Sequence, residues 1–113
     1  MPPVLPVELP APIADFVSAR NRRDYESAVA AFAPTAEVTD EGGVHRGRPA
    51  IRAWMEDTVR KYDDTAEVLA MDRDDGTVRL AVRISGKFAG SPATLRFAFT
   101  LADDRIARLE IGA

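Results

Sequence analysis

Two side chains that can exchange protons lie close together in the middle of the sequence. Asp40 comes just before the Gly42-Gly43 turn, and His45, the only histidine, follows that turn. An unperturbed histidine has a pKa of about 6.5, so His45 can act as an acid or a base near neutral pH. At a pocket wall, the pKa of Asp40 would rise above its ordinary value of about 3.9. A pair across this short hairpin would form a proton relay, so we predict Asp40 and His45 as catalytic residues.

Both residues also have a purely structural interpretation. An aspartate after a strand commonly caps the turn, because its side chain bonds its own downstream backbone. A histidine at a pocket rim can bond a loop carbonyl. Glu41 is a weaker candidate for chemistry, and we expect its side chain to be solvated. The catalytic and the structural interpretations both stay open from the residues alone.

The aromatic residues recur at spacings that suit a hydrophobic core more often than a cofactor site. Trp54 is the exception, because a buried indole N–H usually needs a hydrogen-bond partner. Arg46 and Arg48 could steer an anionic ligand, although we expect both to be solvated or paired with acidic neighbours.

Composition excludes several classes of site. The chain has no cysteine and one histidine, which argues against disulfides, thiol nucleophiles and zinc. No phosphate loop or nucleotide fingerprint is present, so we expect no cofactor and no metal. The net charge of -3 argues against nucleic-acid binding. Arg20, Arg22 and Arg23 form a short basic cluster, which we expect to be the solvated end of a helix.

No apolar run is long enough to span a membrane. The first residues also lack the basic start and unbroken apolar run of a signal peptide. We therefore expect a cytoplasmic protein without a membrane partner. The prolines of residues 1–11 favour an extended N-terminal arm, followed by one domain over residues 12–113.

The first half of the domain carries helix signals. Prolines at the entry and apolar residues at helical spacing predict a helix over about residues 12–22. Asp24 is the expected N-cap of a second helix, whose apolar stripe reaches Phe32 before Pro34 stops it. A third helix is expected to begin at Pro49.

The second half is strand-like, with turn residues between the strands. The expected strands are 36–40, 44–47, 66–73, 77–88, one centred on 95–101, and 105–112. Alternation in the strand 77–88 and in the strand around 95–101 places apolar residues on one face, while Arg79, Arg83 and Arg96 lie on the other. Helices followed by a strand meander predict an α+β domain with helices covering one sheet face.

This order of elements resembles a known superfamily. The resemblance rests on the YxxAVAAFxP ending at 25–34, the segment AEVTDEGGVHRGRPAIRAW at 36–54, and the final strands at 77–112. The pattern G-x-x-A-I-R-x-W at 47–54 is the most specific part. Together they resemble the SnoaL-like domains of the nuclear transport factor 2-like superfamily, which also contains ketosteroid isomerase.

The resemblance implies a cystatin-like fold, in which a cone-like curved antiparallel sheet packs against three N-terminal helices around a pocket. It also implies a homodimer through the outer sheet face. The expected ligand is a small, mostly apolar molecule. The residues expected to bind it are Phe16, Trp54, Tyr62, Phe97 and Phe99.

The resemblance also separates this chain from the steroid isomerases. Asp40 matches their general base, but Phe16 and Phe97 stand where that enzyme places its two oxyanion donors. Losing one such donor costs about 2.7–4 kcal/mol of transition-state stabilisation. We therefore do not expect steroid isomerisation by that mechanism. Acid–base catalysis of the isomerase, cyclase or dehydratase type, ligand binding without turnover, and a dimerisation module stay open.

Overall fold

The first two helices begin where the sequence supplies start signals. The computed structural model describes residues 9–112, so most of the predicted arm over residues 1–11 lies outside the described residues. Helix α1 spans Ala11–Asn21 with a proline in its first turn, where a missing N–H costs no hydrogen bond. Asp24 caps α2 (Tyr25–Ala30), because its carboxylate accepts a hydrogen bond from the backbone N–H of Ser27 at 3.2 Å.

The second helix is shorter than its apolar stripe predicts. It ends at Ala30, and Phe32 begins strand β1 (Phe32–Asp40), so the expected extension of the helix to Phe32 is wrong. Pro34 therefore lies inside a strand. The pairing of β1 with its neighbour shifts register between Phe32 and Glu37. A proline at such an irregularity removes no regular ladder hydrogen bond.

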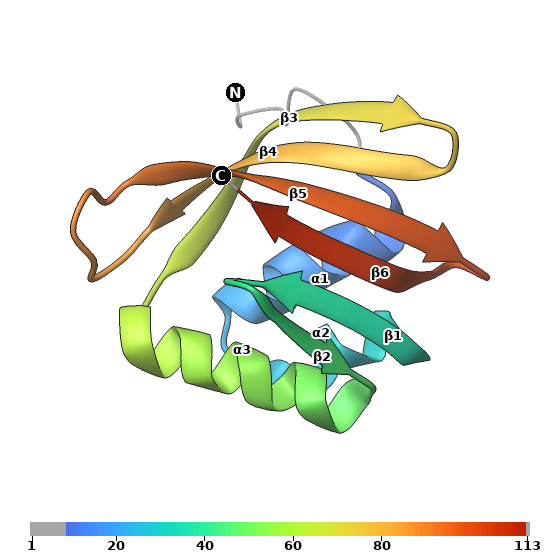
Figure 1. Cartoon of the computed structure of the whole chain (residues 1–113), viewed down its shortest axis with the longest axis horizontal. Helices are drawn as coiled ribbons and strands as arrows, with labels where there is room; N and C mark the ends of the chain where they lie inside the picture. Colours follow the sequence, from blue (N-terminus) through green and yellow to red (C-terminus); the bar gives the residue numbers. More distant parts are fainter. Residues whose placement is uncertain (1–8, 113) are drawn as a thin grey trace.

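Six strands form one sheet in the order β2-β1-β6-β5-β4-β3 (Figure 1). The other strands are β2 (Gly43–Arg46), β3 (Thr65–Asp74), β4 (Thr77–Ser85), β5 (Ala93–Ala102) and β6 (Arg105–Gly112). Neighbouring strands are antiparallel except β1 and β6, which run parallel. The expected α+β architecture is confirmed, but the sheet is mixed rather than wholly antiparallel. Alternation in the sequence shows which residues face the core, but it does not show which strand the last strand joins.

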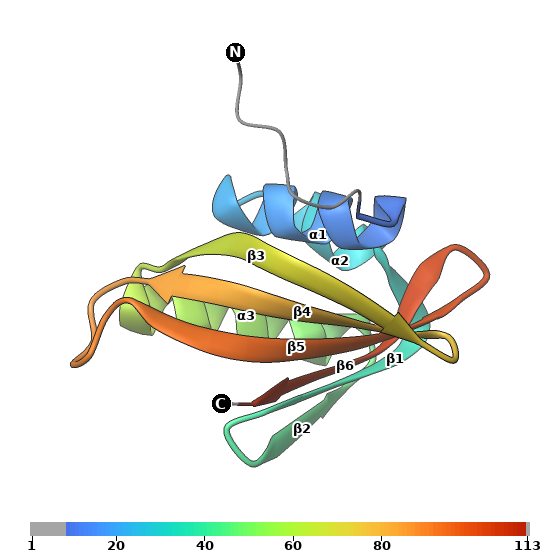
Figure 2. The same ribbon diagram turned by 90° about the horizontal axis from the view of Figure 1, so that it is seen from above.

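Helix α3 (Arg48–Tyr62) connects the β1–β2 hairpin to β3. It begins after Gly47, whose φ of 83° is in the left-handed region that favours glycine. Its buried face consists of Ile51, Trp54, Met55 and Val59. Figure 2 shows α1 and α2 lying together on one side of the sheet.

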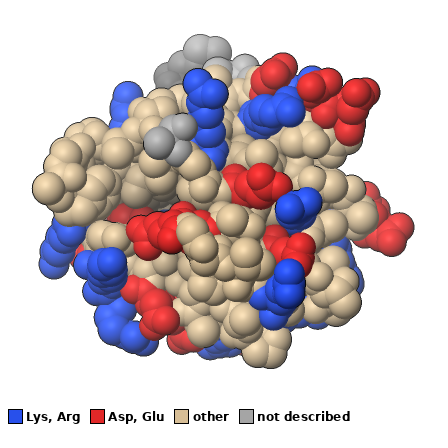
Figure 3. All heavy atoms as spheres, viewed as in Figure 1, with Lys and Arg blue, Asp and Glu red and all other residues tan. Residues whose placement is uncertain are grey.

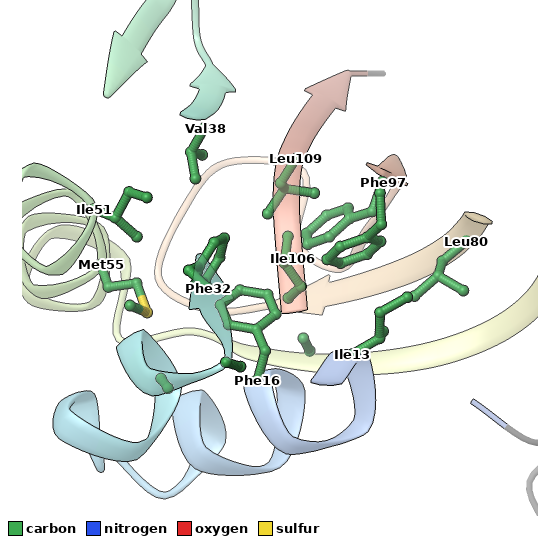
Figure 4. Close-up of a cluster of buried hydrophobic side chains, with 14 of the residues drawn as sticks. Ile13, Phe16, Phe32, Val38, Ile51, Met55, Leu80, Phe97, Ile106 and Leu109 are labelled. Atoms are coloured by element: carbon green, nitrogen blue, oxygen red, sulfur yellow. The ribbon is translucent and has the colours of Figure 1, made fainter. Parts of the chain in front are cut away.

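The core forms where α1 meets the sheet. Phe16 is fully buried and packs edge-on against Phe32 and Phe99, with ring centroids 5.2 Å and 6.1 Å away. In Figure 4, Ile13 and Phe16 project from α1 toward the strands. Burying each such side chain contributes roughly 1.5–3 kcal/mol.

The outer face of the sheet is polar, as the alternation predicts. Arg79, Arg83 and Arg96 are exposed, and a hollow on this face includes Ala81 and Ala98 between strands β4 and β5. Basic and acidic side chains alternate over the face of the molecule shown in Figure 3. Within residues 9–112, no helix combines the length and apolar character needed to cross a membrane. The cytoplasmic location stays a prediction.

Candidate functional site

A cavity of about 200 Å³ lies between helix α3, the C-terminal part of α1 and the sheet. Strands β4, β5 and β6 give the cavity an apolar wall, and most of the atoms that line the cavity are apolar. The lining residues divide by chemistry. The polar ones are Arg20, Asp40, Glu41, Thr58, Tyr62 and Asp64. The apolar and aromatic ones are Trp54, Ile84, Phe88, Ala93, Leu95, Phe97 and Ile111.

Asp40 is the last residue of β1 and lies at the cavity wall. Its Oδ2 accepts a hydrogen bond from the indole Nε1 of Trp54 at 3.0 Å. Burial raises the pKa of Asp40, and the nearby charge of Glu41 adds to this rise. The hydrogen bond from Trp54 opposes it by stabilising the carboxylate. Desolvation is the largest of these effects, so Asp40 holds a proton more tightly than a solvated aspartate.

The hairpin and the third helix together position this pair. In the β1–β2 ladder Asp40 pairs with Gly43, which ends the strand at a tight turn. Trp54 lies on the buried face of α3, where its ring turns the N–H toward the end of β1. The unpaired indole N–H that the sequence singled out thus finds its partner in the predicted base.

His45 lies next to this pair but outside the cavity lining. It pairs with Val38 in the ladder, and its ring centroid lies 6.1 Å from that of Trp54. Among the described residues, no hydrogen bond joins His45 to Asp40. Trp54 occupies Asp40 Oδ2 instead, while the charge of His45 still acts to lower the pKa of Asp40. The proton relay between Asp40 and His45 stays a prediction.

The aromatic residues predicted to bind a ligand separate into two groups. Trp54, Tyr62 and Phe97 line the cavity. Phe16 and Phe99 do not, which corrects their expected place on the wall: both are fully buried in the core, where they contact one another. Phe16 is on the part of α1 that packs under the sheet, one turn before the part that reaches the cavity.

The rim of the cavity is closed by contacts between three segments. The hydroxyl of Tyr62, at the end of α3, donates a hydrogen bond to Glu41 Oε1 at 3.1 Å. Phe88, in the loop between β4 and β5, packs edge-on against the Tyr62 ring with centroids 5.7 Å apart. The backbone N–H of Lys87 also donates to the Tyr62 carbonyl. These contacts hold the loop over one end of the cavity.

A buried ion pair at the wall is the part of the site that sequence reasoning missed. Arg20 Nη2 donates to Asp64 Oδ2 at 2.8 Å, and both side chains are buried. The expectation of a solvated helix end is therefore wrong for Arg20. A signal was present, since Arg20 follows Ile13 and Phe16 on one face of α1 at positions i+7 and i+4.

The described residues offer no obvious place for a metal ion. Within residues 9–112, no three histidine, aspartate or glutamate side chains gather closely enough to hold one.

Comparison with known proteins identifies the family. The family model of the SnoaL-like domain matches residues 13–109, which is nearly the whole chain. The chain belongs to the SnoaL-like domain family. No curated protein matches the sequence.

Solved structures agree with this SnoaL-like assignment. A candidate polyketide cyclase from Sinorhizobium meliloti is 38% identical, with a TM-score of 0.88, and the match covers 91% of this chain and 94% of that one. A hypothetical protein from Catenulispora acidiphila with a ketosteroid isomerase-like fold, solved with trimethylamine, is 15% identical with a TM-score of 0.81. That match covers 94% of this chain and 87% of that chain. A computationally designed 17-OHP binder, 14% identical, has a TM-score of 0.76 over 91% of this chain and 88% of its own. The last two show the shared fold.

Proposed function

We propose that this SnoaL-like protein is a cofactor-free acid–base catalyst that moves a proton on a small, mostly apolar molecule. The observation that carries the proposal is Asp40, a carboxylate with a raised pKa at the wall of a largely apolar cavity. A general base works best when its pKa approaches the operating pH. Burial raises the pKa of Asp40 and so brings it closer to neutral pH. Trp54 holds the carboxylate in one orientation. The reaction would be of the isomerase, cyclase or dehydratase type.

The size of the cavity limits the substrate. About 200 Å³ is less than the roughly 300–1,000 Å³ of sites that bind drug-sized ligands. A compound of one or two rings is therefore a better candidate than a steroid. The neighbour solved with trimethylamine supports the idea that this fold accommodates small molecules.

Hydrogen exchange tests this proposal without knowledge of the natural substrate. The protein is incubated in deuterated water with cyclohexanone or β-tetralone, and NMR measures the exchange of hydrogens beside the carbonyl. We expect the wild type to exceed the buffer rate. Asp40→Asn should lose on the order of a hundredfold or more, because general base catalysis contributes about 10²–10⁴-fold.

Two further variants sharpen the result. Asp57→Asn changes an exposed carboxylate on the solvent side of α3, outside the cavity lining, and should keep full exchange. Glu41→Gln tests whether the neighbouring carboxylate of Glu41, rather than that of Asp40, is the base. Loss of exchange in Glu41→Gln with full exchange in Asp40→Asn would move the base to Glu41 and overturn the assignment.

Ligand binding without turnover is the second candidate function. It is favoured by Phe97, which lines the cavity with a ring that cannot donate a hydrogen bond to a developing oxyanion. Binding of β-tetralone by wild-type protein, seen as NMR shift changes at cavity residues, together with exchange no faster than in buffer, would support this function over catalysis.

We also propose that two copies of the chain associate through the outer sheet face. The hollow there combines small residues with charges of both signs, including Ala98, Arg96 and Glu110. In a two-fold interface, a surface meets its own copy, so arginine and glutamate can pair across it.

A further inference from the structure

The ion pair of Arg20 and Asp64 gives the cavity a second polar position besides Asp40. The two side chains come from α1 and from the link between α3 and β3, and they are 6% and 4% exposed. Both residues line the same cavity as Asp40. The same cavity is also lined by the apolar side chains of Ile84 and Leu95.

Each member of the pair has one polar atom left over. Arg20 Nη1 and Asp64 Oδ1 are buried and have no hydrogen-bond partner among residues 9–112. The polar groups around them are used: Asn21 both donates to and accepts from the backbone of Ala66, and Arg23 donates to the Asp64 carbonyl. A buried polar atom without a partner is costly, so this donor and this acceptor have hydrogen bonds to offer a ligand.

We propose that Arg20 and Asp64 bind a neutral hydroxyl group, which makes the ligand a small, mostly apolar alcohol or phenol. A hydroxyl group contains one donor and two acceptor positions. It can therefore donate to Asp64 Oδ1 while it accepts from Arg20 Nη1. The carboxylate of Asp64 would repel an anionic group, and the guanidinium of Arg20 would repel a cationic one. The ion pair therefore favours a neutral group.

This inference rests on the proposed function in one respect, since both place the ligand in the same cavity. The hydroxyl contact would hold the ligand at one end, with its carbon skeleton against Ile84, Leu95 and Phe97. The carboxylate of Asp40 would then face one particular carbon atom of the ligand, because the bound ligand could no longer rotate freely in the cavity. Arg20 and Asp64 would act as specificity-determining residues, distinct from the base.

A matched set of ligands and one double variant test the inference. The probes are β-naphthol, naphthalene and β-naphthoate, which share a ring system and differ in one substituent. Affinities are measured by NMR titration for wild type, for Asp40→Asn and for Arg20→Met/Asp64→Leu. Replacing both partners with apolar residues of similar size avoids leaving one buried charge unpaired, so the variant should fold. Its thermal unfolding and its naphthalene affinity confirm that the cavity persists.

We expect β-naphthol to bind wild type about tenfold more tightly than naphthalene, as one or two added hydrogen bonds would give. The double variant should lose this preference, whereas Asp40→Asn should keep it. Equal affinity of the two probes for wild type, tightest binding of β-naphthoate, or a preference that survives in the double variant would overturn the inference. Failure of all probes to bind would overturn it together with the proposed cavity ligand. A preference present in a wild type that shows no hydrogen exchange would count against catalysis alone.

Discussion

The carboxylate of Asp40 has neighbours with opposite effects on its protonation. Burial and the charge of Glu41 raise its pKa, whereas the indole N–H of Trp54 lowers it. The rise prevails, so the folded state binds the proton more tightly than the unfolded state does. This difference links the pH to the free energy of unfolding.

Asp40→Asn should reveal that link. In wild type, the contribution of Asp40 to stability falls as the pH rises from about 3.9, the unfolded value, through the raised folded pKa, and then levels off. Asparagine has no charge to lose, and its oxygen can still accept from Trp54. The variant should therefore gain stability relative to wild type across this pH window. Urea unfolding at a series of pH values measures the difference; a difference that stays constant with pH would mean that burial does not dominate.

Arg20 and Asp64 have a different energetic character, because each neutralises the other in the interior. Arg20→Met alone leaves a buried carboxylate without its partner and should cost about 3–5 kcal/mol. Arg20→Met/Asp64→Leu should be neutral or up to about 1–4 kcal/mol more stable than wild type. Denaturant unfolding of the two variants checks both values. A single variant as stable as the double one would show that the pair is not buried in solution.

At the scale of elements, the link between α3 and β3 depends on one close contact. A Cβ atom at Gly86 would lie 2.6 Å from the Tyr62 carbonyl and 2.7 Å from Asp64 Cβ. Neither atom is the free end of a flexible side chain, so the backbone would have to move. That movement would displace Asp64 and Tyr62, which both line the cavity.

Gly86→Ala should therefore lose about 1–3 kcal/mol of stability, the usual cost of overpacking. Gly112→Ala is the matched control, because nothing lies within 4 Å of its added Cβ. The control should stay within about 0.5 kcal/mol of wild type. Thermal or urea unfolding compares the two, and equal stability would contradict the tight packing between Gly86 and Asp64.

The elements that the sequence predicted well are those with local signals. The hairpin between β3 and β4 turns at Asp75 and Gly76, where the residues with positive φ are those of an Asp-Gly turn. The parallel contact of β1 with β6 has no local signal, since the two strands are distant in the sequence. Arg20 was missed for a related reason: its charge suggested solvent, and only the folded chain brings Asp64 to it.

The candidate site was likewise foreseen in part. The local sequence pattern predicts Asp40 at the end of a strand and Trp54 on the buried face of a helix. The structure brings the two side chains into contact. Which phenylalanines line the cavity depends on the exact placement of α1 on the sheet. Helical spacing identifies the buried face of α1, but it does not divide that face between core and cavity.

At the scale of the whole molecule, the outer sheet face carries the proposed dimer. Light scattering should give the mass of two chains for wild type. Ala98→Glu fills the hollow with a larger side chain where a close two-fold contact needs a small one, so it should shift the mass toward one chain. Ser18→Glu, on the exposed side of α1, is the control and should leave the mass unchanged. A wild-type mass of one chain would contradict the dimer.

The parallel pairing of β1 with β6 also has a consequence for the order in which the site is assembled during folding. β1 ends in the proposed base, whereas Ile111 reaches the same cavity from β6, a neighbour that is distant in the sequence. Contacts between such distant segments form late, because long loops must close first. A folding intermediate that has formed the β1–β2 and β3–β4 hairpins, but has not yet paired β6 with β1, would hold Asp40 and Trp54 without a complete cavity wall. Ligand binding would therefore report the last pairing step of folding rather than the formation of the local elements.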